Sequence, residues 1–332
     1  MCILMHWLAA PKRGQINMND NSSVIVSLCS HLCADSCQPF TPSEWAKFAK
    51  MLMEKSLQPK DVIDFSTEDF KHKLFYTDDE IHRIRSLFDR SGSLTFELEK
   101  YSSMGIKVVT RADVEYPRVL KSKLKENCPP LFYYAGDLNL TNQGYAGFVG
   151  SRTIDDNDTD FTKHTVSTIG KNGFGVVSGG AKGVDSIASA AMLADGGFCI
   201  EYLADSLARK IKKRDVVSQV QKGNLLLISV AKPDAGFNAG FAMQRNKFIY
   251  AQSKGTIVVK SDYDKGGSWS GATEALRNGY CPVFCRNNQK SLGNKKLIEL
   301  GAIAIDENWD GKLDVPVTKK KDPKEDQLSL FG

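Results

Sequence analysis

The chain has 332 residues, of which 42% are hydrophobic and 25% are charged, a composition typical of a globular protein with a buried core and unlike that of a fibrous or disordered chain. Its formal net charge of +5 permits a polyanionic partner without demonstrating one. No apolar run approaches the roughly 20 residues of a membrane span, and the charge of the first residues follows their apolar stretch, so we predict neither a membrane segment nor an export signal. The eight cysteines are then best explained as reduced thiols in a cytoplasm.

The N-terminal region has the sequence pattern of a small helical bundle. Residues 41–44 and 77–80 both match a capping box, with threonine at the first position and glutamate three residues later. Apolar residues follow each box at helical spacing, which indicates core packing and no catalytic role. We interpret the basic residues of this region as a solvated face.

A cluster of potential metal ligands also lies in this region. Cys29, His31, Cys33 and Cys37 have the residue types of a zinc site, yet the cysteines are spaced at i, i+4 and i+8. That spacing places them on one face of a helix, where cysteine packs as a small apolar residue. Because a matching second ligand pair is missing downstream, we favour a buried helix face over zinc and predict no metal.

From residue 105 onward, short apolar runs alternate with helical segments. Because these runs are apolar on both faces, they predict a Rossmann-like parallel sheet with helices on both faces, preceded by the all-helical domain. Neither a strict P-loop nor a dinucleotide-binding fingerprint is present, which argues against an ATPase, an NAD enzyme and any bound cofactor. The expected strands are 106–109, 147–149, 175–177, 199–203, 225–228, 256–259 and 282–284, and the main expected helices are 160–171, 184–195, 248–251 and 272–277.

Three glycine-containing turns follow strands of this predicted sheet, at 150–152, 178–183 and 265–271. Ligands of such sheets bind at the carboxyl ends of the strands, and glycine-rich turns that open into helices are suited to phosphate. The basic segment 245–247, with aromatic residues at 237, 241, 248 and 250, suits a groove in which phosphates are neutralised and bases stack. The candidate phosphate-binding residues are Gly150, Ser151, Arg152, Ser178, Gly179, Gly180, Lys182, Gly183, Arg245, Asn246, Lys247, Gly266, Gly267 and Ser268.

The order of these motifs resembles the DNA processing protein A (DprA/Smf) family over residues 105–304. The similar segments are 105–106, 113, 116–120, 130–136, 149–152, 177–185, 245–247, 267–269, 293, 297–298 and 301–302. The resemblance implies an extended Rossmann fold and a non-enzymatic homodimer in the bacterial cytoplasm. It also implies that the protein binds single-stranded DNA in DNA uptake, recombination or repair and loads a RecA-type recombinase.

The sequence departs from the family pattern at three positions. Ser189, Lys260 and Gly271 stand where the family usually has histidine, glutamate and threonine. The same core also resembles nucleotide-sensing Rossmann domains and phosphoribohydrolases. The alternative is therefore a nucleotide-binding sensor, or a hydrolase in which Asp185 or Glu274 serves as general acid or base.

The C-terminal segment Gln327, Leu328, Ser329, Leu330 and Phe331 is similar to the peptide by which bacterial proteins bind the replication sliding clamp. Three of its side chains are apolar anchors at the end of a polar stretch, and the alternative is that they dock on the protein's own core. We therefore expect a flexible extension over 1–22, a helical SAM-like domain over 23–105, a Rossmann-like domain over 106–310 and a disordered tail carrying this motif over 311–332.

Overall fold

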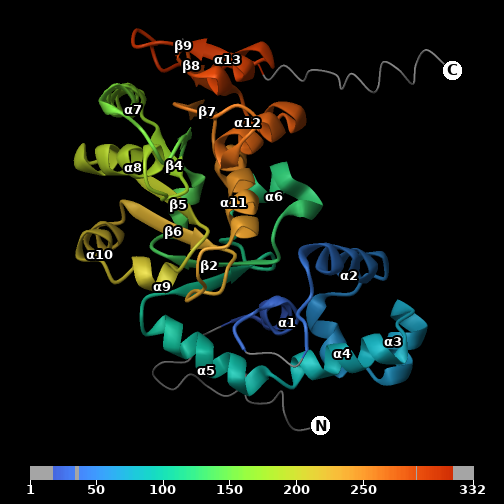
Figure 1. Ribbon diagram of the computed structural model, residues 1–332. Helices are drawn as coiled ribbons and strands as arrows, with labels where there is room; N and C mark the ends of the chain where they lie inside the picture. Colours follow the sequence, from blue (N-terminus) through green and yellow to red (C-terminus); the bar gives the residue numbers. More distant parts are fainter. Residues whose placement is uncertain (1–17, 34–36, 289, 317–332) are drawn as a thin grey trace, which may run out of the picture. The chain divides into compact units, whose positions relative to one another are not determined.

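The computed structural model describes residues 18–33, 37–288 and 290–316, which fall into two compact units (Figure 1). The first unit contains the chain up to Ala135 together with Ser206–Lys212 and Ser229–Ala235. The second contains Gly136–Asp205, Lys213–Ile228 and the chain from Gly236 onward. Within the described ranges, no helix combines the length and apolarity that crossing a bilayer requires.

Helices dominate the first unit, as expected. Both predicted capping boxes are present: Thr41 caps α2 and Thr77 caps α4, each with the reciprocal bond from its own N–H to the following glutamate. The helix α1 begins at Asp20, inside the range predicted as a flexible extension. The elements of this unit are α1 (Asp20–Cys29), α2 (Pro42–Glu54), η2 (Pro59–Asp64), α3 (Thr67–Leu74), α4 (Asp78–Phe88), α5 (Ser91–Ser102), β1 (Lys107–Thr110), α6 (Arg118–Leu124), η3 (Lys125–Asn127), β2 (Leu131–Ala135) and α9 (Leu207–Lys210).

The predicted cysteine face is wrong in its geometry. The helix α1 ends at Cys29, and Ser30 is extended, so Cys33 and Cys37 lie beyond the helix. Ser30 is held there by a buried hydrogen bond of 2.9 Å between its Oγ and the hydroxyl of Tyr133. Cys29 itself is buried, as predicted, and no group of His, Cys, Asp or Glu among the described residues could hold a metal ion.

The second unit carries a seven-strand arrangement in the order β6, β5, β4, β3, β7, β8, β9, and every neighbouring pair from β5 to β9 is parallel. The predicted α/β class is confirmed, although β1 and β2 of the first unit pair antiparallel. The strands are β3 (Tyr145–Val149), β4 (Gly175–Ser178), β5 (Cys199–Leu203), β6 (Leu225–Ser229), β7 (Gly255–Val258), β8 (Val283–Arg286) and β9 (Ile303–Ile305).

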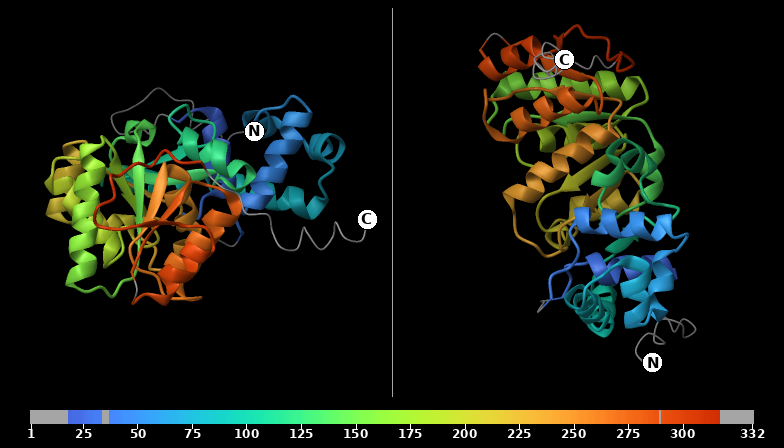
Figure 2. Two further views of the ribbon diagram at one scale, coloured as in Figure 1. Left: turned by 90° about the horizontal axis from the view of Figure 1, so that it is seen from above. Right: turned by 90° about the vertical axis from the view of Figure 1, so that its right-hand side faces the viewer.

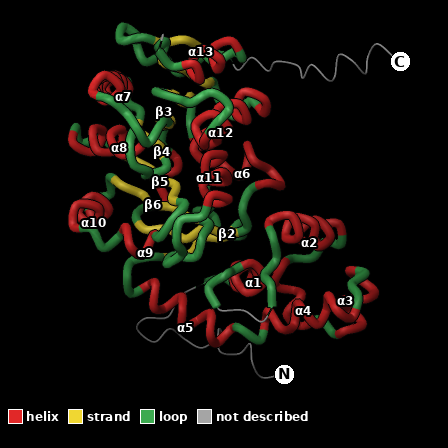
Figure 3. The backbone as a smooth tube through the Cα atoms, in the orientation of Figure 1, coloured by secondary structure: helices red, strands yellow, loops and turns green. Residues whose placement is uncertain are grey.

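Helices cover both faces of this sheet (Figures 1 and 2). One face is covered by α7, α8 and α10 and the other by α11 and α12, and Figure 3 distinguishes these helices from the strands between them by colour. The residues of β3, β4 and β7 are buried throughout, which explains their continuous apolar runs. The helical elements are η4 (Leu138–Asn142), α7 (Asp156–Lys171), α8 (Val184–Ala194), α10 (Arg214–Gln221), α11 (Ala239–Gln252), α12 (Gly266–Asn278) and α13 (Leu292–Glu299).

The strand β3 lies where the strand order of the sheet reverses, which is the topological switch point. The chain proceeds from β3 through β4 and β5 to β6 on one side, and from β7 through β8 to β9 on the other. The crevice outside the carboxyl ends of two such strands is the usual ligand site of an open α/β sheet. The ends of β3 and β7 are therefore the place to look for function.

Three predicted boundaries are wrong. The helix α12 begins at Gly266, so residues 266–271 form its first turns and are not a loop before it. The helix α11 begins at Ala239, which places the segment 245–247 inside a helix and not at its end. Leu313, expected in a disordered tail, is buried, and a methyl group on Gly255 would lie 3.0 Å from its Cδ2.

Candidate phosphate-binding cavity

A cavity of about 580 Å³ opens at the carboxyl ends of β3 and β7. Its walls are formed by the turn after β3, the beginning of α8, the first half of α11, the segment after β7 and the first turns of α12. The turns after the two strands are bonded to each other, because the N–H of Ser151 donates to the carbonyl of Lys260 over 2.9 Å. The cavity is thus built into the switch point of the sheet.

The structure brings together only part of the predicted phosphate-binding set. The predicted residues that line the cavity are Gly150, Ser151, Arg152, Arg245, Asn246, Gly266, Gly267 and Ser268. The others lie outside its lining: Ser178, Gly179, Gly180, Lys182, Gly183 and Lys247. Lys182 is exposed, but it is absent from the cavity wall.

Arg152 is one of the predicted phosphate ligands that line the cavity. It is exposed at the mouth of the cavity, and its guanidinium lies 5.0 Å from the ring centroid of Phe237. Phe237 is 57% exposed and also lines the cavity. A guanidinium beside an exposed aromatic ring offers one group for a phosphate and one face for a base.

The second glycine-rich turn, 178–183, already binds a carboxylate of the protein itself. The N–H of Gly179 donates to Oδ2 of Asp185 over 3.1 Å. Ser178 is buried, and its Oγ lies 3.0 Å from Oγ of Ser189. Gly183 has a φ of +91°, and a Cβ there would collide with the carbonyl oxygen of Ser151. This turn therefore shapes the cavity wall, and its predicted use as a direct phosphate cradle gains no support from its geometry.

Arg245, which the sequence suggested as a phosphate ligand in a groove, is bound to a carboxylate of the protein itself. It is 8% exposed, and its Nη1 lies 3.2 Å from Oδ2 of Asp185. The guanidinium fills the space that a Cβ of residue 179 would need, so Gly179 is required for this pair to form. Burial raises the pKa of the Asp185 carboxyl, while Arg245 and the backbone N–H groups of Ala181 and Gly179 oppose that shift.

One atom of this buried pair is left without a partner among the described residues. Nε of Arg245 is buried and makes no hydrogen bond there. Arg245 thus lines the cavity, is paired with Asp185, and has one donor without a partner among the described residues.

The next two residues of α11, Asn246 and Lys247, contact other parts of the second unit. Nδ2 of Asn246 donates to the carbonyl of Gly267 over 3.0 Å and so holds the beginning of α12. Nζ of Lys247 lies 3.1 Å from Oε1 of Glu274, and both line a second cavity of about 280 Å³. The two carboxylates considered for general acid or base catalysis, Asp185 and Glu274, are therefore both bound to cations.

The charges that line the main cavity favour an anion. Arg245 is paired with Asp185 and Lys260 with Asp158, so the remaining cations are Arg152 and Lys265, and Asp262 is the remaining anion. This excess of positive charge in the cavity wall favours phosphate groups.

Sequence reasoning missed part of the wall and misplaced some aromatic residues. It predicted Phe248 and Tyr250 for base stacking, but both are buried in the core, and Phe241 is half-buried. It overlooked the exposed Met243 in the cavity wall and the pair Tyr263 and Trp269, whose ring centroids lie 5.0 Å apart beside the segment after β7. Residues 260–265 follow a buried strand, and this position was the signal that could have pointed to Tyr263.

The three departures from the family pattern have local explanations. Ser189 forms the buried contact with Ser178, and Lys260 forms an ion pair of 2.9 Å with Asp158. A Cβ at Gly271 would lie 2.9 Å from the ring of Tyr250, so the small residue allows α11 and α12 to approach closely. Each departure is therefore accommodated by a partner within the second unit.

The fold and the cavity together define a Rossmann-type protein with a cavity lined by cations at the switch point of its sheet. The family model of DNA recombination-mediator protein A matches residues 107–312, which is more than half of the chain. The chain therefore belongs to that family. This is a family of DNA-binding proteins and not of enzymes, in agreement with our prediction that the chain is not an enzyme.

Individual relatives agree with this assignment. The chain is 27% identical to DNA processing protein DprA of Bacillus subtilis (strain 168) over 213 residues, which cover 63% of this chain and 71% of that protein. It is 27% identical to Protein Smf of Synechocystis over 266 residues, which cover 76% of this chain and 63% of that protein. The X-ray structure of DNA processing protein A from Streptococcus pneumoniae superposes with a TM-score of 0.60 at 22% identity, covering 81% of this chain and 95% of that chain, and supports the fold.

Proposed function

We propose that the cavity between the ends of β3 and β7 binds single-stranded DNA during DNA uptake, recombination or repair. The observation that carries the proposal is the excess of cations in the cavity wall together with the exposed Phe237. Phosphates are neutralised by Arg152 and Lys265, and a base that is free of a complementary strand stacks on the aromatic ring. Membership in the recombination-mediator family supports the same conclusion.

The size of the cavity supports a strand whose bases are exposed. A cavity of about 580 Å³ suits a nucleotide-sized group and is too small to enclose a double helix. A duplex also hides its base faces from Phe237. We therefore expect a clear preference for single strands over duplexes of the same sequence.

The decisive experiment compares binding of a labelled oligonucleotide, as a single strand and as a duplex, by the full chain at two salt concentrations. We expect tighter binding of the single strand, with an affinity that falls steeply as salt rises, because counterions are released from each neutralised phosphate. Binding of a mononucleotide in the same range, with weak and salt-independent binding of the strand, would instead support the nucleotide-sensor alternative.

Arginine variants separate the cavity from general surface charge. Arg152→Gln is expected to weaken binding of the single strand about tenfold or more, since it removes a phosphate ligand and the partner of Phe237. The matched control is Arg277→Gln, which removes an exposed arginine from the last turn of α12, outside the cavity lining. Equal losses in the two variants would contradict the assignment of the cavity.

We also propose the partners that the family resemblance implies: a second copy of this chain and a RecA-type recombinase, with the sliding clamp as an additional partner. The clamp-binding segment 327–331 lies outside the described residues. Deletion of 327–332 is expected to abolish capture by the clamp and to leave DNA affinity unchanged. Stimulation of recombinase filament assembly on coated single strands tests the loading role, and light scattering tests the dimer.

A further inference from the structure

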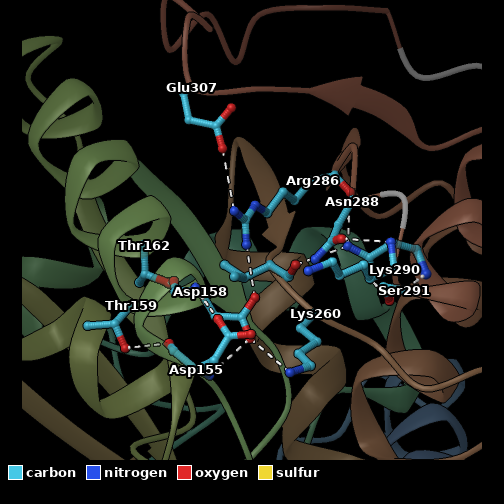
Figure 4. A network of polar contacts seen from close by, with 12 residues as sticks. Asp155, Asp158, Thr159, Thr162, Lys260, Arg286, Asn288, Lys290, Ser291 and Glu307 are labelled. Carbon is cyan, nitrogen blue, oxygen red and sulfur yellow. Dashed lines mark hydrogen bonds and ion pairs between the residues drawn. The ribbon is translucent and has the colours of Figure 1, made fainter.

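Lys260 is a cation of the cavity wall that is held by a network outside the cavity. It lies two residues after the end of β7, its side chain is 29% exposed, and it lines the cavity. Its Nζ lies 2.9 Å from Oδ2 of Asp158, which is buried in the first turn of α7 (Figure 4).

Asp158 has a second cation that is fixed more firmly. Nη1 of Arg286 lies 2.9 Å from Oδ1 of Asp158, and the Arg286 side chain is only 12% exposed. Its guanidinium also packs 4.5 Å from the ring centroid of Phe161, and its Nη2 lies 3.4 Å from Oε1 of Glu307 (Figure 4). Arg286 is therefore held by contacts on three sides.

The unequal fixation of the two cations has a physical consequence. A buried carboxylate that loses its partner is strongly destabilised, which normally prevents an ion pair from opening. Here Asp158 keeps Arg286 when Lys260 leaves, so the cost of releasing Lys260 is small. Lysine also carries its charge on a flexible four-carbon stem, whereas the guanidinium of Arg286 is stacked in place.

Of the four charged residues in this network, Lys260 is in the described cavity wall, and Asp158, Arg286 and Glu307 are not. We propose that Lys260 is a further phosphate-contacting residue, which exchanges Asp158 for a phosphodiester oxygen when a single strand occupies the cavity. The inference rests on the proposed function and adds a contact to it. Lys260 and Arg152 then line the same cavity from the segments that follow β7 and β3.

The test is a salt titration of single-strand binding by Lys260→Gln, Lys260→Arg and the matched control Lys254→Gln. Lys254 is exposed and precedes β7, so the control removes the same charge from the opposite end of the same strand. Loss of one phosphate contact makes the negative slope of log affinity against log salt less steep by about 0.7 for single strands. The ratio of wild-type affinity to Lys260→Gln affinity is thus expected to shrink roughly threefold between 50 and 200 mM salt.

The outcomes are distinct. The inference is supported if the salt dependence is less steep in Lys260→Gln, while Lys260→Arg and Lys254→Gln retain the wild-type slope. It is overturned if wild type binds with a steep slope and Lys260→Gln binds identically, a result that leaves the proposed function intact. If wild type itself shows no salt-dependent binding of single strands, the proposed function fails and this inference fails with it.

A second measurement does not depend on a variant that folds. The full chain is acetylated briefly with and without a saturating oligonucleotide, and lysine modification is quantified by mass spectrometry. Protection of Lys260 with unchanged modification of Lys254 is expected. Equal modification of Lys260 in both samples would contradict a contact with the strand.

Discussion

The buried pair between Arg245 and Asp185 allows a sharp test of how the cavity wall is built. We consider Arg245→Met, which keeps much of the side-chain volume and removes the charge that lies 3.2 Å from Oδ2 of Asp185. Removing one partner of a buried ion pair leaves the other charge uncompensated and costs about 3 to 5 kcal/mol. We expect a loss of that size in the free energy of unfolding at neutral pH.

The loss has a predictable dependence on pH. Burial raises the pKa of Asp185 above its unfolded value, so the folded state binds the proton more tightly and stability falls as pH rises through the interval between the two pKa values. Arg245 opposes this shift, so its removal raises the folded pKa further and extends the interval upward. The variant should therefore lose less stability at pH 5 than at pH 8.

The assay is equilibrium urea unfolding at both pH values, followed by circular dichroism. The double variant Arg245→Met/Asp185→Asn carries no buried charge at the pair and should be more stable at pH 8 than the single variant, with a weaker dependence on pH. An equal loss at pH 5 and pH 8, or a double variant no more stable than the single one, would refute this account of the pair.

Four further predictions follow from the described contacts. Phe237→Ala should weaken single-strand binding by about 1 to 3 kcal/mol in a titration with labelled oligonucleotide, because a stacked base loses its platform. Gly183→Ala should destabilise the fold by about 1 to 3 kcal/mol, since φ is +91° and the new Cβ meets the carbonyl of Ser151. A lower midpoint in thermal unfolding would show this loss. Leu313→Ala should lower the free energy of unfolding by about 2 to 5 kcal/mol, as measured with urea. An unchanged stability would contradict the packing of 311–316 on the second unit. The Arg83 hydrogen bond lowers the pKa of Glu44 to about 2, so Glu44→Gln should cost up to about 1 kcal/mol at pH 7 and almost nothing near pH 2, as thermal melts at the two pH values would reveal.

Much of the fold could be predicted because the strands of the second unit are buried on both faces. Such strands appear in the sequence as short apolar runs, and the predicted 199–203 coincides with β5. The strand β2 was not among the expected strands, so its antiparallel pair with β1 was missed as well. The beginnings of α11 and α12 were missed because glycines at 240, 266 and 267 have low helix propensity, and tertiary contacts such as that of Asn246 with Gly267 hold them.

The cavity was predictable in position but not in detail. The residues after β3 and β7 were expected to lie together because parallel strands end at one edge. The roles of Arg245 and Lys260 depend on partners 60 and 102 residues away in the sequence, namely Asp185 and Asp158. These pairs cannot be read from local spacing in the sequence, so Arg245 was expected to bind phosphate without a partner in the protein, and Lys260 was noted only as a departure from the family pattern.

The absence of a side chain at Gly179 also has an evolutionary consequence. The guanidinium of Arg245 fills the volume that even a methyl group at position 179 would need. A descendant that replaces Gly179 by a larger residue must shorten or displace Arg245 at the same time, and Asp185 then loses its counter-charge. The three positions are expected to change together or not at all, so drift at this edge of the sheet should proceed by coupled substitutions.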